Sequence, residues 1–111
     1  MTAGTVVAFV PDLMDRSKVA AVLGARGRFV ATPEALVTEA AGADVAVVDL
    51  DRLAAAPDGL DVVSDVAARV GRVVGYAPHV ERERLEEARA RGCDQVLARS
   101  AFFTQLATLL G

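Results

Sequence analysis

The strongest constraint on the fold is an alternation of short β-type runs with segments of helical period, repeated along the whole chain. The β-type runs are rich in Val, Ala and Leu, and the segments between them space their apolar residues at a helical period. Such an alternation is typical of βαβ units that build a parallel sheet. We expect strands over residues 5–10, 28–32, 44–50, 72–76 and 95–98.

Local signals mark where the intervening helices begin and end. Thr32 followed by Pro33 is a natural N-cap with proline at the first helical position. Gly24 or Gly27, Gly71 and Gly92 are expected to end helices, and Ser100 is expected to cap the last one. Five helices are therefore expected, over residues 13–25, 33–41, 58–70, 80–91 and 100–110.

Right-handed crossovers limit how five such strands can join one sheet with helices on both faces. They favour a doubly wound α/β fold, the flavodoxin-like (βα)5 arrangement with strand order 2-1-3-4-5. The chain has 111 residues, a length that suits one domain spanning residues 1–111. Hydrophobic residues make up 53% of the chain and Trp is absent, so the core must be built from Val, Leu and Ala.

Charge and composition narrow the class of partners. The net charge is −3 and the 12 Lys and Arg residues are scattered among acids, which argues against nucleic-acid and anionic-membrane binding. The single Cys93 forms no internal disulfide and is expected to be buried. No apolar run approaches the length of a membrane span and no signal peptide begins the chain, so we expect a cytoplasmic protein.

Two acids follow predicted strands that this topology makes neighbours. Asp49 lies at the C-terminal end of the strand over residues 44–50, and Asp12 follows the first strand. The carboxyl ends of parallel strands are where open α/β sheets place their ligands. We expect the Asp12 and Asp49 carboxylates to meet there, with mutual repulsion that raises a pKa and that Mg²⁺ relieves.

Other chemistries lack their motifs. The chain has no GxGxxG or GxxxxGK[ST] loop, and no nucleophile elbow is visible. We therefore expect no conventional enzyme activity.

The strand pattern, Asp49, Asp12 and the segment from Gly92 to Leu97 resemble the receiver domain of bacterial two-component response regulators, over essentially the whole chain. In that family the acid ending strand three accepts a phosphoryl group, and an acidic pair after strand one holds Mg²⁺. A Thr or Ser ends strand four, and a Lys ends strand five.

The resemblance assigns a role to each matching position and also shows where the chain departs from the family. Asp49 falls on the phosphoacceptor, and Asp12 falls on the second metal-binding acid. Pro11 stands where the family has the first acid, Tyr76 replaces the Thr or Ser, and Arg99 replaces the Lys. These changes imply a weakened Mg²⁺ site at Asp12 and Asp49.

Two functions remain open. In the first, the chain is a stand-alone, atypical receiver or pseudo-receiver that acts through protein–protein interaction. In the second, it is a phosphorylatable single-domain response regulator of a phosphorelay, with Asp49 as the nucleophile and Mg²⁺ as cofactor. The resemblance implies a histidine kinase or a downstream effector as the protein partner.

Three further residues, His79, Asp51 and Phe103, have two interpretations each, and Asp15 has one. His79 either begins a helix in solvent or contacts an anion at the pocket rim, and Asp51 is either a solvated loop acid or a pocket residue. Asp15 is assigned to the first turn of a helix, where it suits the dipole. Phe103, on a last helix without charges, either packs on a neighbouring helix or joins an exposed apolar strip that docks a partner or a second copy.

Overall fold

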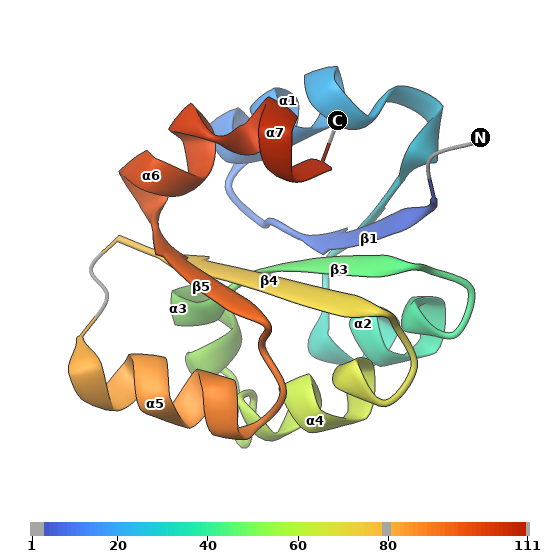
Figure 1. The fold of residues 1–111 in the computed structure, drawn as a ribbon. Coiled ribbons are helices and arrows are strands. Elements are labelled where there is room, and N and C mark those ends of the chain that lie inside the picture. Colours follow the sequence, from blue (N-terminus) through green and yellow to red (C-terminus); the bar gives the residue numbers. More distant parts are fainter. Residues whose placement is uncertain (1–3, 79–80, 111) are drawn as a thin grey trace.

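All five predicted strands form, and they lie parallel in one sheet in the order β2-β1-β3-β4-β5. The computed structural model describes residues 4–78 and 81–110. Figure 1 shows the sheet as the middle layer of the molecule, with helices above and below it. The predicted flavodoxin-like topology is therefore confirmed. The strands are β1 (Val6–Phe9), β2 (Gly27–Val30), β3 (Val45–Asp49), β4 (Arg72–Ala77) and β5 (Gln95–Ala98).

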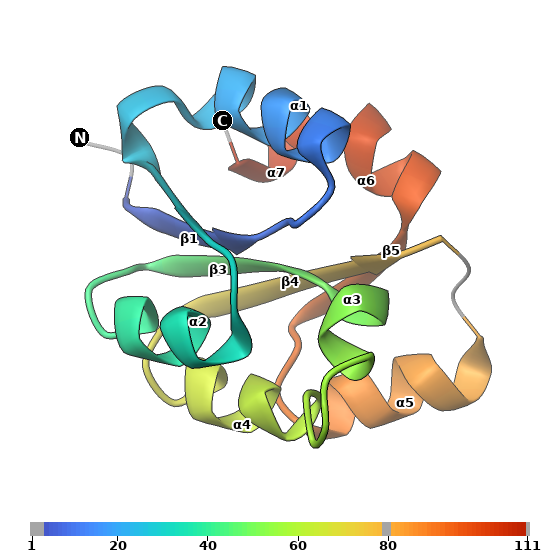
Figure 2. The ribbon, with the colours of Figure 1, turned by 180° about the vertical axis from the view of Figure 1, so that it is seen from behind.

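The helices divide between the two faces of the sheet. Figures 1 and 2 show one group of helices on each face. The first group is α1 (Leu13–Leu23), α6 (Arg99–Thr104) and α7 (Leu106–Leu110), and a 3-10 turn, η1 (Gly24–Arg26), follows α1. The second group is α2 (Pro33–Ala40), α3 (Leu50–Ala54), α4 (Asp61–Ala67) and α5 (Arg82–Ala90).

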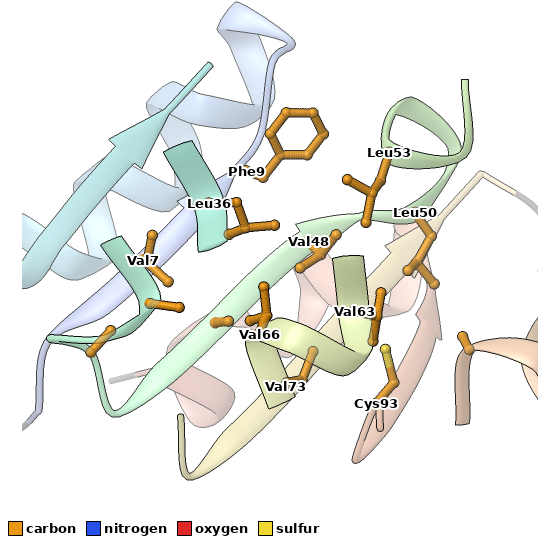
Figure 3. Packing of buried hydrophobic residues seen from close by; sticks show 14 of the residues in the cluster. Val7, Phe9, Leu36, Val48, Leu50, Leu53, Val63, Val66, Val73 and Cys93 are labelled. Atoms are coloured by element: carbon orange, nitrogen blue, oxygen red, sulfur yellow. The ribbon is translucent and has the colours of Figure 1, made fainter. Parts of the chain in front are cut away.

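Each face of the sheet covers its own apolar cluster, because successive strand residues point to opposite sides. The cluster under α2 to α5 includes Cys93, which is buried as predicted, and burial raises the pKa of its thiol to about 11. Figure 3 shows strand and helix side chains of this cluster gathered in one layer. The cluster under α1, α6 and α7 contains Val6, Ala8, Val10, Val19, Leu23, Val47, Val74, Tyr76, Phe102, Leu106 and Leu110.

Several predicted local signals are confirmed. The Thr32 hydroxyl accepts the Ala35 N–H at 3.1 Å, and Pro33 is the first residue of α2. Gly24, with φ of 55°, follows the last residue of α1. Gly92, with φ of 121°, lies just beyond the end of α5.

Other helix boundaries differ from the prediction. A short helix, α3, begins directly after β3 and was not predicted. The helix expected to open at Asp58 begins at Asp61, because the Asp58 backbone has a φ of 54°, which is incompatible with a right-handed helix. The expected start of α5 at residue 80 lies outside the described residues.

The terminal helical segment also departs from the prediction, both in where it begins and in having a break. The prediction that Ser100 caps it is wrong, since α6 begins at Arg99 and its N-cap residue, Ala98, makes no side-chain hydrogen bond. A break at Gln105 divides the segment into α6 and α7. Backbone hydrogen bonds from Gln105 N to Ala101 O and from Leu109 N to Gln105 O nevertheless continue across the break.

Candidate functional site

The parallel pairing of β1 with β3 brings the two predicted acids to the same edge of the sheet. Phe9 is in register with Val48, so the residues that follow both strands emerge at one carboxyl edge. A pocket of about 180 Å³ lies at this edge. All of the predicted site residues line it, and their chemical roles remain predictions. The lining residues are Asp12, Asp15, Asp49, Asp51, Arg52, Tyr76, Pro78 and Arg99.

Asp12 is the N-cap of α1. Its Oδ1 accepts the backbone N–H groups of Met14 at 2.9 Å and of Asp15 at 3.0 Å. The hydrogen bond from Asp15 N is the main reason that the pKa of Asp12 lies below its ordinary value. The capping role therefore favours the charged carboxylate.

Asp49 is buried, with 6% of its surface exposed, and it is the N-cap of α3. Its Oδ1 accepts the Arg52 N–H at 3.2 Å. Burial raises the pKa of Asp49, and the hydrogen bond from Arg52 offsets part of that rise. The nearby charges that raise this pKa further belong to Asp51 and Asp15, so the predicted repulsion between Asp12 and Asp49 is not its main cause.

Arg99 is held by an acid that was not assigned to the site from sequence. Its Nε donates to Asp15 Oδ2 at 3.2 Å, and its Nη2 donates to Asp15 Oδ1. The Asp15 side chain is only 3% exposed, whereas that of Arg99 is 43% exposed. Asp15 does lie in the first turn of α1, as predicted, and helical spacing offers the missed signal. The third residue after a capping acid turns toward the same side of the helix as the cap.

Tyr76 is completely buried, in the layer between the sheet and α6. Its ring stacks on Phe102 with a centroid distance of 4.5 Å and an interplanar angle of 11°. The phenol oxygen finds no hydrogen-bond partner among the described residues. Burial is the first cause, and the charge of Asp49 the second, of a pKa raised above the ordinary value for tyrosine.

Phe103 is partly buried and packs within an aromatic cluster. It makes edge contacts with Tyr76, at 5.7 Å between centroids, and with Phe102, at 4.9 Å. Cationic groups of Lys18 and Arg99 lie 5.1 Å and 5.2 Å from its ring centroid. The Lys18 contact joins Phe103 to the neighbouring helix α1, as the packing interpretation expects, and docking at this face stays a prediction.

Asp51 and His79 were the other two candidates for the pocket. Asp51 lines the pocket and is also exposed, but it lies in the first turn of α3. The chain is helical at Asp51 because β3 ends at Asp49 and α3 begins at Leu50. His79 lies outside the described residues.

The carboxylates at the pocket fit a divalent metal poorly as they are arranged. Mg²⁺ requires near-octahedral oxygen ligands. Both oxygens of Asp15 are engaged by Arg99, and one oxygen each of Asp12 and Asp49 accepts backbone N–H groups. Within residues 4–78 and 81–110, no three acid, His or Cys side chains gather closely enough to hold a metal ion.

A second, larger hollow of about 500 Å³ lies between α2 and α4. Its lining is mostly apolar, with Glu34 as its one ionisable side chain among the described residues, so it lacks groups for catalysis or metal binding. The lining residues are Pro33, Glu34, Val37, Ala56, Pro57 and Val62.

Comparison with known proteins finds similarity in structure alone. No family model matches the sequence, and no curated protein matches it. No helix in the described part of the chain is long and apolar enough to cross a membrane.

Solved structures of response regulators are similar over nearly the whole chain. A response regulator from Hahella chejuensis has a TM-score of 0.79 and 18% identity, covering 97% of this chain and 92% of that one. The signal receiver domain of the putative response regulator NarL from Mycobacterium tuberculosis has a TM-score of 0.77 and 20% identity, covering 98% and 94%.

A third similar structure is a response regulator from Burkholderia pseudomallei with a phosphorylated aspartic acid, a calcium ion and citrate. Its TM-score is 0.77 and its identity 17%, and the match covers 96% of this chain and 66% of that one. The strand order, the flanking helices and these similarities agree. The chain has the flavodoxin-like fold of response regulator receiver domains.

Proposed function

We propose that this chain is an atypical receiver-type signalling domain, a pseudo-receiver that acts through contacts with protein partners. The main observation behind this proposal is that the Arg99 guanidinium donates hydrogen bonds to both oxygens of the buried Asp15. A cation neutralised in this way is less available to bind phosphoryl oxygens beside Asp49.

Two other features of the pocket support the same proposal. Pro11 replaces an acid that the resemblance places in the metal site, and Pro has no side-chain oxygen to offer. Tyr76 stands where a small hydroxyl side chain is expected, and its ring is stacked on Phe102. A phenol held in this layer has less freedom to swing toward Asp49 than a threonine hydroxyl.

The exposed surface beside the pocket supports recognition by a protein. Leu13 and Met14, at the start of α1, are each 72% exposed and are the large apolar side chains most open to solvent in the described part of the chain. Exposed apolar side chains that adjoin one another often mark interaction sites. A histidine kinase or a downstream effector is the partner class that the resemblance implies.

Phosphorylation of Asp49 is the second candidate function. It is favoured by the placement of Asp49, Asp12 and Arg99 around one pocket, and the Burkholderia pseudomallei response regulator carries a phosphorylated aspartic acid. In this alternative the Asp49 carboxylate is the nucleophile, and Arg99 must leave Asp15 to contact the transferred group.

Intact-mass measurement after incubation with Mg²⁺ and a small phosphodonor distinguishes the two candidates. A pseudo-receiver keeps its mass, and Asp49→Ala leaves its partner binding unchanged. Addition of one phosphoryl group to the wild type, with loss of that addition in Asp49→Ala, would establish the second candidate instead. The control variant is Asp51→Ala, which removes the neighbouring exposed acid and keeps Asp49.

A further inference from the structure

The pocket gathers more carboxylates than arginines. Four acids and two arginines line it, and the side chains of Asp15 and Asp49 are almost fully buried. Burying a carboxylate without a partner is costly, since the lost hydration must be replaced by opposite charge or hydrogen bonds. In a site of this kind a bound metal ion is one source of the missing positive charge, and a side chain is the other.

Arg99 supplies that charge in a form suited to a carboxylate. Its guanidinium meets both oxygens of Asp15 through two different nitrogens, a paired geometry that the ammonium of lysine cannot make. The same guanidinium lies over the ring of Phe103, 5.2 Å from the centroid. The cation is thus held from two sides, by α1 through Asp15 and by α6 through Phe103.

The position of this pair links two helices that are far apart in sequence. Asp15 lies in α1 and Arg99 begins α6, 84 residues later. One turn further along α1, the Lys18 ammonium also lies over Phe103, at 5.1 Å from its centroid. The two helices therefore meet through two adjacent contacts beside the pocket.

We propose that Arg99 is the resident cation of the pocket, and that its ion pair with Asp15 takes the structural place of a divalent metal. The pocket then keeps its shape, and α1 stays fixed to α6, without a bound ion. This inference concerns the same pocket as the proposed function. Its test measures stability and not phosphoryl transfer, so the two can fail separately.

A double-mutant cycle in the full chain tests the pair. Arg99→Gln leaves Asp15 buried without its cation and should lower the melting temperature by roughly 10 °C or more. Asp15→Asn should cost less, because solvent reaches the half-exposed Arg99. The double variant Asp15→Asn/Arg99→Gln should melt above Arg99→Gln alone. Additive losses in the double variant, or a double variant that fails to fold, would overturn the proposal.

Magnesium supplies the second readout. Millimolar Mg²⁺, compared with a chelator, should leave the melting temperature of the wild type unchanged. It should raise that of Arg99→Gln by at least about 3 °C, because the pocket acids then lack a cation. Equal stabilisation of the wild type and Arg99→Gln by Mg²⁺ would also overturn the proposal.

The ion pair between Arg91 and Asp61 is the matched control. It also joins two helices, but its acid is 58% exposed. Arg91→Gln should lower the melting temperature by less than about 4 °C and should create no response to Mg²⁺. A Mg²⁺ response in Arg91→Gln equal to that in Arg99→Gln would show that the effect is not specific to the pocket and would refute the inference.

Discussion

At the scale of single residues, the pocket contains one buried polar atom without a partner in the described part of the chain, the Tyr76 hydroxyl. A hydroxyl taken from water without a compensating hydrogen bond costs free energy, whereas the ring around it gains from stacking and burial. The ring and the hydroxyl of Tyr76 therefore act in opposite directions on the stability of the fold.

Tyr76→Phe separates these two contributions. It removes only the hydroxyl, so the free energy of unfolding should stay the same or rise by up to about 1 kcal/mol. Tyr76→Leu, which loses the stacking on Phe102, should instead lower it by about 2 kcal/mol. Both values come from urea denaturation. A loss above about 1 kcal/mol in Tyr76→Phe would mean that the hydroxyl has a partner in solution.

The two capping acids of the pocket should respond to pH with opposite signs. Burial raises the pKa of Asp49, so its native carboxyl holds a proton more tightly than in the unfolded chain. Asp49 thus lowers stability as pH rises above the ordinary carboxyl range. Backbone hydrogen bonds lower the pKa of Asp12, which adds stability above that range and loses it as pH falls through the native pKa.

Asp49→Asn and Asp12→Asn form a matched pair for this effect. Asp49→Asn should raise the melting temperature at about pH 7, and the gain should shrink on acidification to about pH 3. Asp12→Asn should lower it slightly at neutral pH, since Asn caps a helix almost as well as Asp. Thermal denaturation across this pH range measures both. A gain in both variants would mean that repulsion between the two acids dominates the pocket.

At the scale of elements, the connection from α5 to β5 depends on a backbone conformation that favours glycine. Gly92 has a φ of 121°, and a Cβ on it would lie 2.5 Å from the Cβ of Ala67 in α4. This connection leads into β5 and so helps to place Arg99 at the pocket.

Gly92→Ala should lower the free energy of unfolding by roughly 2 kcal/mol, through backbone strain and a clash with α4. Gly42→Ala is the control, because its new Cβ would meet only the flexible end of the Arg28 side chain. That variant should change stability by less than about 0.5 kcal/mol. Equal losses in the two variants, measured by chemical denaturation, would contradict this account of Gly92.

At the scale of the whole molecule, self-association through the terminal helices remains a proposal. Phe103→Glu is a poor test of it, because Phe103 packs among Tyr76 and Phe102 and its replacement would damage the fold. Exposed residues on α7, such as Ala107 and Thr108, test the same face without disturbing that cluster.

Ala107→Arg should abolish a dimer formed through this face and leave the melting temperature nearly unchanged. Sedimentation velocity measures the oligomeric state, and Ala55→Arg, exposed on the other side of the sheet, is the control. A dimer that persists in Ala107→Arg would exclude the terminal helices as its interface.

The sequence by itself determined the sheet, its strand order and the edge at which Asp12 and Asp49 meet. The strands and helix starts follow from local patterns, namely apolar runs and capping residues such as Thr32, which can be read within a few residues. The strand order follows from the handedness of the crossovers, a rule that applies to any chain of this pattern.

Only the tertiary structure decided the partner of Arg99 and the surroundings of Phe103. Both depend on how α1 and α6 pack over the same face of the sheet, and no local pattern links residues 84 positions apart. The short helix α3 was missed for a related reason, because Asp49 serves both as a strand end and as the cap of the next helix. Side-chain pairing across helices is a property of packing, so it appears only when the whole chain is folded.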